Sequence, residues 1–280
     1  MPSLLLAACG GQPKIAAAPP RILPAQGIDL PTDASDALNE IKDSKIDFVA
    51  RYYRSPESRW PTLTAGEAAR LSSLGLKIVT VWEWHSHDPG YFSYGSGYDD
   101  AKSAHAQAKS VGQPAGSAIY FAVDYNAPGS DISGSIEQYF RGVAAGLSAA
   151  GGGRSDYKVG VYGSGAVCEA VKRAGLAQYS WLTSATAWAG TLNYNDWNIR
   201  QGGHFSVLSF DHDSDEAQGD YGGFQTAGVA AAPVDGSNPV NASTSYDTTA
   251  SRDVVPPPAP REGRVPLESQ WPTIATMSSL

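Results

Sequence analysis

The stretch Ala118-Ile119-Tyr120-Phe121-Ala122-Val123-Asp124-Tyr125 decides the fold class. Its apolar residues are almost continuous rather than alternating, which is typical of a parallel strand that is covered on both faces. A carboxylate, Asp124, stands where the apolar run ends. Sequence with helical periodicity lies on both sides, at 98–111 and 132–147. Because strand and helix alternate here, we expect parallel strands with helices packed against them.

Apolar runs of the same kind recur along the chain. We predict eight strands, at residues 27–30, 47–53, 77–84, 118–125, 158–163, 180–185, 197–201 and 206–211. Between them lie helices that begin near Asp33, a plausible N-cap, and at Thr64, which with Glu67 forms a capping-box pattern. The last strands leave little room for helices. The sequence therefore predicts an α/β fold, a (β/α)8 TIM-type barrel with a degenerate last quarter.

An open, doubly wound sheet is the alternative fold. No G-x-G-x-x-G follows the first strand, so the dinucleotide-binding version of that sheet is disfavoured.

The composition divides the chain into three parts: residues 1–25 as a leader and tether, 26–225 as the barrel, and 226–280 as a tail rich in Pro, Ala and Ser. Such a tail cannot bury enough apolar surface to offset the entropy of ordering, so we expect it to be disordered. The leader contains Leu6-Ala7-Ala8-Cys9, which resembles a bacterial lipoprotein cleavage site. This resemblance implies a start upstream, a lipid anchor at Cys9, and an extracellular or cell-envelope location.

Charge and hydropathy exclude two classes of partner. Lys and Arg total 20 against 28 Asp and Glu, a net charge of −8, and a negative chain is poorly suited to binding nucleic acid. No apolar run reaches the roughly 20 residues that a membrane helix needs. Cys168, the other cysteine, lies in a helical pattern without the context of a nucleophile, so we expect it to be buried. We expect a monomer without a cofactor or a bound metal.

Acidic residues recur where apolar strands end. In a barrel of this kind, functional residues lie at the C-terminal ends of the strands. Carboxylates that gather in one site raise each other's pKa, so one can act as an acid while another acts as a base or nucleophile. Glycosidic bonds are hydrolysed by such a pair. The candidate catalytic residues are Asp29, Glu83, Asp124 and Asp211. The alternative is structural: Asp29 and Asp211 pair with Arg51 or cap helices.

Aromatic and polar residues near the same strand ends are candidates for binding sugar rings and hydroxyl groups. They are Arg51, Tyr53, Trp82, Trp84, Tyr125, Tyr162, Trp181 and Gln201.

Five segments together resemble one known family. They are 27–29, 48–53, 119–125, 159–163 and 210–211, and they look like the glycoside-hydrolase-like domain catalogued as domain of unknown function 1906. That family occurs in secreted or envelope proteins, largely of actinobacteria, and is similar to the family-25 lysozymes, which cleave peptidoglycan with a barrel. The resemblance implies roles for Asp29, Asp124 and Asp211. Ala122 stands where those lysozymes carry the first acid of an Asp-x-Glu pair.

Three functions remain open from the sequence. The first is a glycoside hydrolase that acts on envelope or extracellular polysaccharide resembling peptidoglycan. The second is a barrel that binds carbohydrate without cleaving it. The third is a metal-dependent hydrolase, since His85 and His87 form a His-x-His after a strand and His212 lies beside Asp211. The run 211–215 resembles the start of a calcium loop but lacks its later Gly and Glu, which argues against an EF-hand.

Overall fold

The computed structural model describes residues 24–202 and 208–227. The expectations for Cys9, for residues 1–23 of the leader and for residues 228–280 of the tail lie outside these ranges. Among the described residues, no helix combines the length and the apolar character needed to span a bilayer.

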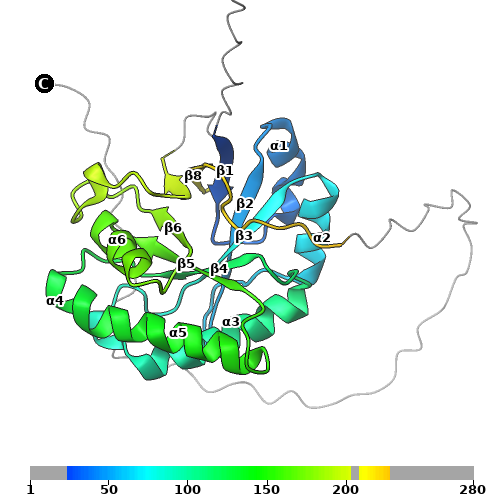
Figure 1. Cartoon of the computed structure of the whole chain (residues 1–280). Coiled ribbons are helices and arrows are strands. Elements are labelled where there is room, and N and C mark those ends of the chain that lie inside the picture. The colour runs from blue at the N-terminus through cyan, green and yellow to red at the C-terminus, as the bar shows by residue number, and fades with distance from the viewer. Residues whose placement is uncertain (1–23, 203–207, 228–280) are drawn as a thin grey trace, which may run out of the picture. The chain divides into compact units, whose positions relative to one another are not determined.

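The described residues form a closed barrel in which the strands follow one another in chain order (Figure 1). The strands are β1 (Ala25–Asp29), β2 (Phe48–Tyr53), β3 (Lys77–Trp82), β4 (Ala118–Ala122), β5 (Lys158–Gly163), β6 (Tyr179–Leu182), β7 (Ile199–Gln201) and β8 (Asp213–Ala217). The prediction of a TIM-type α/β barrel is confirmed, and closure of the sheet excludes the open doubly wound alternative.

The last strand corrects the prediction in position and in direction. The sequence analysis placed it at 206–211, with Asp211 at its end, but β8 spans Asp213–Ala217 and Asp211 precedes it. β8 pairs antiparallel with both β7 and β1, whereas all other neighbours are parallel. β7 and β8 are consecutive in the chain and antiparallel, so the chain reverses direction between them.

Helical segments connect the parallel strands. They are η1 (Ala34–Ala37), α1 (Leu38–Asp43), α2 (Ala65–Ser73), η2 (Pro89–Tyr91), α3 (Tyr94–Val111), α4 (Gly129–Asp131), the π-helical η3 (Ile132–Ile136), α5 (Glu137–Ala150), α6 (Gly165–Arg173) and η4 (Thr191–Asn193). The predicted N-caps are present: Asp33 accepts from Ser35 N, and Thr64 Oγ1 accepts from Glu67 N at 3.2 Å. The Glu67 carboxylate does not complete a capping box. It accepts from Arg51 of β2 instead.

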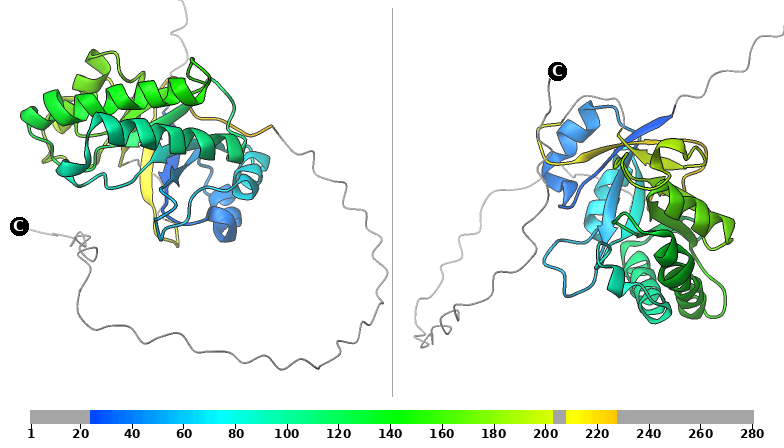
Figure 2. Two further views of the ribbon diagram at one scale, coloured as in Figure 1. Left: turned by 90° about the horizontal axis from the view of Figure 1, so that it is seen from below. Right: turned by 90° about the vertical axis from the view of Figure 1, so that its left-hand side faces the viewer.

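Two apolar layers hold the barrel. One lies between strands and helices and includes the buried Cys168, as predicted. The other consists of strand residues with Tyr221 and therefore fills the barrel itself. In the outer layer, α3 and α5 run side by side (Figure 2). They approach closely because small residues face each other: a Cβ at Gly142 would lie 2.1 Å from Tyr94 O, and one at Gly97 would lie 2.0 Å from Tyr139 O.

The segment after β8 closes the barrel at the end where the parallel strands begin. Ala118 N donates to Gly222 O at 3.0 Å, and Phe224 forms an antiparallel bridge with Ile78. The Tyr120 hydroxyl, inside the barrel, donates to Tyr221 O at 2.9 Å. The opposite end, where the parallel strands finish and β8 starts, is therefore the end at which polar side chains can meet a ligand.

Candidate active site

Strand alternation decides which side chains reach the interior of the barrel. On β2, Ala50 and Tyr52 belong to the interior layer, whereas Arg51 and Tyr53 point towards the helices. The same parity places Asp29, the last residue of β1, inside the barrel beside Tyr52. The Tyr52 hydroxyl donates to Asp29 Oδ1 at 2.6 Å. The sequence analysis did not include Tyr52 among the candidate residues. Tyr52 stands two residues after Ala50, and this spacing places both side chains on the same face of the strand.

Asp29 is the most extensively hydrogen-bonded acid of the site. Besides the bond from Tyr52, Gln201 Nε2 donates to its Oδ2 at 3.1 Å. Only 2% of Asp29 is exposed, so burial raises its pKa to about 7, and repulsion by Asp213 adds to this rise. The bonds from Tyr52 and Gln201 oppose the rise because they stabilise the ionised form.

Asp215, on β8, is a second acid in the barrel interior beside Asp29. It is fully buried, and its Oδ1 accepts from Trp181 Nε1 at 2.9 Å. No N–H or hydroxyl group of the described residues reaches its Oδ2. Burial and the Asp29 charge hold the pKa of Asp215 well above its usual range.

A further acid, Asp124, lies just beyond β4 and close to the same network. The Tyr162 hydroxyl lies 3.0 Å from Gln201 Oε1, and burial and then the charge of Asp124 raise the pKa of Tyr162. Hydrogen bonds therefore run from Asp29 through Gln201 to Tyr162, and Asp124 lies beside Tyr162. Burial raises the pKa of Asp124 to about 6, and the charge of Glu83 raises it further. Asp124 is less buried than Asp29 and so is more accessible to a ligand.

Glu83, just beyond β3, is neutralised by an arginine. Arg54 Nη2 lies 3.0 Å from Glu83 Oε2, and the guanidinium stacks over the Tyr52 ring at 4.4 Å. Burial raises the pKa of Glu83, while Arg54 and His87 pull it down. Glu83 thus lies near Asp124, and Arg54 is its counter-ion.

The acids contributed by β8 differ from the one predicted. Asp211 was placed at the end of the last strand, close to Asp29, but it lies in the loop before β8. Asp213 instead pairs in register with Asp29, and Asp215 enters the interior two residues later. Partial burial raises the pKa of Asp213, and the charge of Asp211 adds to it. The alternation Asp213-Ser214-Asp215 was the signal for a strand, but it was interpreted as a partial calcium loop.

Several predicted sugar-binding residues do not face the mouth. Arg51 and Tyr53 are buried against the helices: Arg51 pairs with Glu67, and the Tyr53 hydroxyl donates to Gln113. Trp181 lies inside the barrel and supports Asp215. Trp82 lies in the apolar layer between strands and helices, and Trp84 and Tyr125 pack against that layer. Of the predicted binding residues, Gln201 donates to Asp29, Trp181 donates to Asp215, and Tyr162 hydrogen-bonds Gln201.

The proposed histidine metal site is not formed. The His85 ring lies between Trp84 and Tyr91, with centroid distances of 4.3 and 5.3 Å, while His87 faces Glu83 and Asp124. Within 24–202 and 208–227, no three His, Cys, Asp or Glu side chains are grouped as metal ligands would be.

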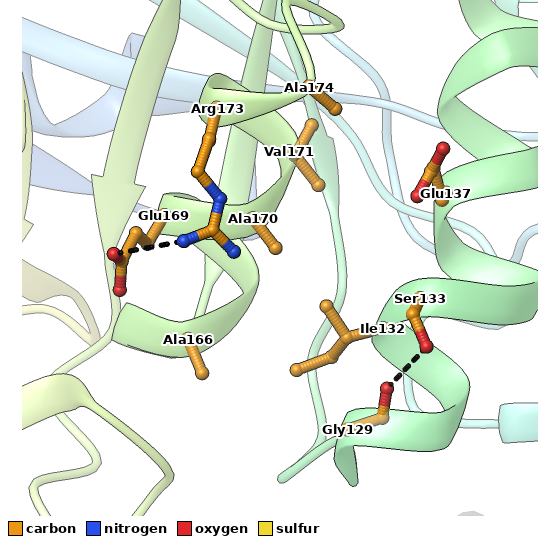
Figure 3. Close-up of a pocket in the computed structure, with 10 residues that line it drawn as sticks. All are labelled: Gly129, Ile132, Ser133, Glu137, Ala166, Glu169, Ala170, Val171, Arg173 and Ala174. Atoms are coloured by element: carbon orange, nitrogen blue, oxygen red, sulfur yellow. Dashed lines mark hydrogen bonds and ion pairs between the residues drawn. The ribbon is translucent and has the colours of Figure 1, made fainter.

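A surface hollow of about 530 Å³ lies elsewhere, between α6 and the segment formed by α4 and η3 (Figure 3). Ile132, Ala166 and Val171 are among the residues that line it, and Glu169 pairs with Arg173 at its edge. None of the acids described above lines this hollow, so it is separate from the candidate active site.

Residues 39–229 match the sequence profile of the Rv2525c-like, glycoside hydrolase-like domain. The chain belongs to this family. It is 31% identical over 163 residues to the uncharacterized protein FadG of Bacillus subtilis, covering 57% of this chain and 28% of FadG. It is 32% identical over 141 residues to YbfG of the same organism, covering 48% of this chain and 19% of YbfG. The alignments with this chain therefore span less than a third of the length of FadG and of YbfG.

Among solved structures, the Tat-secreted protein Rv2525c of Mycobacterium tuberculosis, in complex with L-tartrate, has a TM-score of 0.56 and 20% identity. The alignment covers 71% of this chain and 98% of that protein. This likeness supports the Rv2525c-like barrel fold, and the predicted resemblance to a glycoside-hydrolase-like family is confirmed.

Proposed function

We propose that the mouth of this barrel hydrolyses glycosidic bonds in a cell-envelope or extracellular polysaccharide, with Asp29 and Asp124 as the acid and base pair. The observation that carries the proposal is that two acids, Asp29 and Asp124, lie at the same end of the barrel beside the hydrogen-bonded Gln201 and Tyr162, with pKa values raised to about 7 and about 6. A structural role alone does not require two such acids at the end of the barrel where ligands bind in this fold.

The two pKa values assign the roles. Between pH 6 and 7, Asp124 is ionised while Asp29 keeps its proton. Asp29 then protonates the leaving oxygen, and Asp124 acts as the base or the nucleophile. This order reverses the sequence-based assignment, in which Asp124 or Glu83 was the proton donor. Glu83 is less suited to proton transfer because Arg54 pairs with its carboxylate.

The likeness to Rv2525c supports the location that we propose, and the sequence resemblance supports the substrate. Rv2525c is described as Tat-secreted, which supports an extracellular or envelope location for this chain. Envelope glycan resembling peptidoglycan is the substrate that we propose on the basis of the sequence resemblance.

The test is release of reducing ends from purified cell-wall glycan by the wild type and by Asp124→Asn. We expect a bell-shaped rate profile with limbs near pH 6 and 7, and loss of activity in Asp124→Asn with unchanged circular dichroism. Full activity in Asp124→Asn would exclude the assignment. Glycan binding by the wild type without release of reducing ends at any pH would instead favour the non-catalytic carbohydrate-binding barrel.

A further inference from the structure

Arg54 lies between two of the groups at the acidic end of the barrel. It directly follows β2, and its Nη2 pairs with Glu83 Oε2 at 3.0 Å. The guanidinium also lies over the Tyr52 ring, 4.4 Å from the ring centroid. The Tyr52 hydroxyl in turn donates to Asp29 Oδ1 at 2.6 Å. One cation therefore contacts Glu83 directly and is separated from Asp29 by a single side chain.

Helix α3, in the outer layer, clamps the main chain of Arg54. Gln107 Nε2 donates to Arg54 O at 2.6 Å, and Arg54 N donates to Gln107 Oε1 at 3.2 Å. Thr62 Oγ1 lies 2.8 Å from the same Gln107 oxygen and 2.9 Å from Tyr52 O. These bonds fix the point from which the Arg54 side chain starts, so the guanidinium is held at its base as well as at its tip.

The hydrogen bonding of the guanidinium itself is incomplete. The Arg54 side chain is 11% exposed, and its Nε is buried without a hydrogen-bond partner among the described residues. A buried N–H group without a partner is unfavourable. The contacts with Glu83 and Tyr52, together with the main-chain clamp, therefore decide where the guanidinium lies.

From this geometry we infer that Arg54 is a positioning residue, which holds the Glu83 carboxylate and the Tyr52 ring in place and, through Tyr52, sets the hydrogen bond to Asp29. The inference rests on the proposed function for its catalytic consequence, but its contacts can be tested without activity. The other titratable groups that act on Asp29 and Glu83, or on which these two acids act, are His87, Asp124, Tyr162, Asp213 and Asp215.

The test compares Arg54→Met with the wild type by carboxyl-carbon NMR titration of the folded full chain. Loss of the guanidinium removes a positive charge beside Glu83, so the pKa of Glu83 should rise. It also releases the Tyr52 ring and so weakens the bond to the ionised form of Asp29, whose pKa should rise from about 7. Where hydrolysis is measured, the upper limb of the pH profile should move to higher pH. We expect kcat to fall about tenfold with little change in KM, because Arg54 acts through Tyr52 rather than on the substrate.

Tyr52→Phe separates the two routes by which Arg54 could act on Asp29. Phenylalanine keeps the ring beneath the guanidinium but donates no hydrogen bond. Arg54→Met should therefore raise the pKa of Asp29 in the wild type but not in Tyr52→Phe, while the pKa of Glu83 should rise in both. An equal rise for Asp29 in both backgrounds would show a direct effect of the charge and overturn the inference.

Arg200→Met is the matched control. Arg200 also pairs with a glutamate, Glu216, lies over an aromatic ring, that of Trp197 at 4.9 Å, and has a buried Nε without a hydrogen-bond partner in the described part of the chain. It stands between Ile199 and Gln201, whose side chains face the barrel interior, so its own side chain faces outwards. This change should leave the pKa values of Asp29 and Glu83 as they are.

Arg54→Lys takes the place of Arg54→Met if the latter does not fold. Lysine keeps a charge beside Glu83 but has no planar group to lie over the Tyr52 ring. The pKa of Asp29 should then rise while that of Glu83 stays near its wild-type value. An unchanged Asp29 pKa in a folded Arg54 variant would overturn the inference. Absence of hydrolysis by the wild type would instead refute the proposed function, and the NMR titration would still decide the role of Arg54.

Discussion

Replacing Arg51 should destabilise the barrel without removing a sugar contact. Arg51 and Glu67 are both fully buried, with Nε to Oε1 at 2.6 Å and Nη2 to Oε2 at 3.1 Å. Glu67 Oε1 also accepts from Ala34 N, and Arg51 Nη1 donates to Leu30 O. Removal of one partner leaves a buried charge, which typically costs about 3–5 kcal/mol. We therefore expect Arg51→Met to lose about 4 kcal/mol of unfolding free energy.

Urea unfolding measures this loss. With a slope of about 2–3 kcal/mol per molar, a loss of about 4 kcal/mol lowers the midpoint by roughly 1.3–2 M. The double variant Arg51→Met with Glu67→Leu should recover part of the loss, because it removes both charges but leaves Ala34 N and Leu30 O unpaired.

The control for Arg51→Met is Lys172→Met, which breaks the ion pair with Asp196, a residue whose side chain is 81% exposed. This change should cost below about 1 kcal/mol. A similarly small cost for Arg51→Met, combined with loss of glycan binding, would refute the structural role and restore Arg51 as a ligand-binding residue.

Three further changes test other features. His85→Gly should raise the unfolding free energy by about 1 kcal/mol, because glycine tolerates φ of +48°; a lower melting temperature would contradict backbone strain at this position. Gly142→Ala should destabilise the protein by about 2 kcal/mol, because the new Cβ would meet Tyr94 O. Gly134→Ala is the control: it lies in open space and should be neutral or stabilising by up to ~1 kcal/mol. Equal effects of the two changes in calorimetry would refute the close contact between the helices. Burial raises the pKa of Asp100 from 3.8 to about 6, so its contribution favours the folded state most at low pH and declines as pH rises from about 4 to 6. Asp100→Asn should remove that decline, about 3 kcal/mol in total, and identical pH dependence of melting in both proteins would exclude it.

The sequence predicted the barrel because its parallel strands are apolar on both faces. Each is enclosed by the interior layer and by a helix, so continuous runs such as 118–123 are visible without a structure. Asp29 and Asp124 were identified for the same reason, since each stands where an apolar strand ends.

The errors have two physical causes. Where a strand is apolar throughout, the sequence does not show which alternate residues face the interior, so Arg51 and Tyr53 were chosen and Tyr52 was missed. The closing strand β8 is polar because it supplies Asp213 and Asp215 to the site, and its sequence therefore lacks the apolar signal that located the others.

The reversed direction of β8 determines where the described part of the chain enters and leaves the barrel. β1 starts at Ala25, which pairs with Ala217 at the end of β8, and Thr226 then donates to Ser72 near the end of α2. Entry and exit therefore share the pole opposite the acids. A tether or fusion partner joined at either point would leave the end of the barrel that carries the acids unobstructed, so immobilisation through these points should present that end outward to an insoluble polymer.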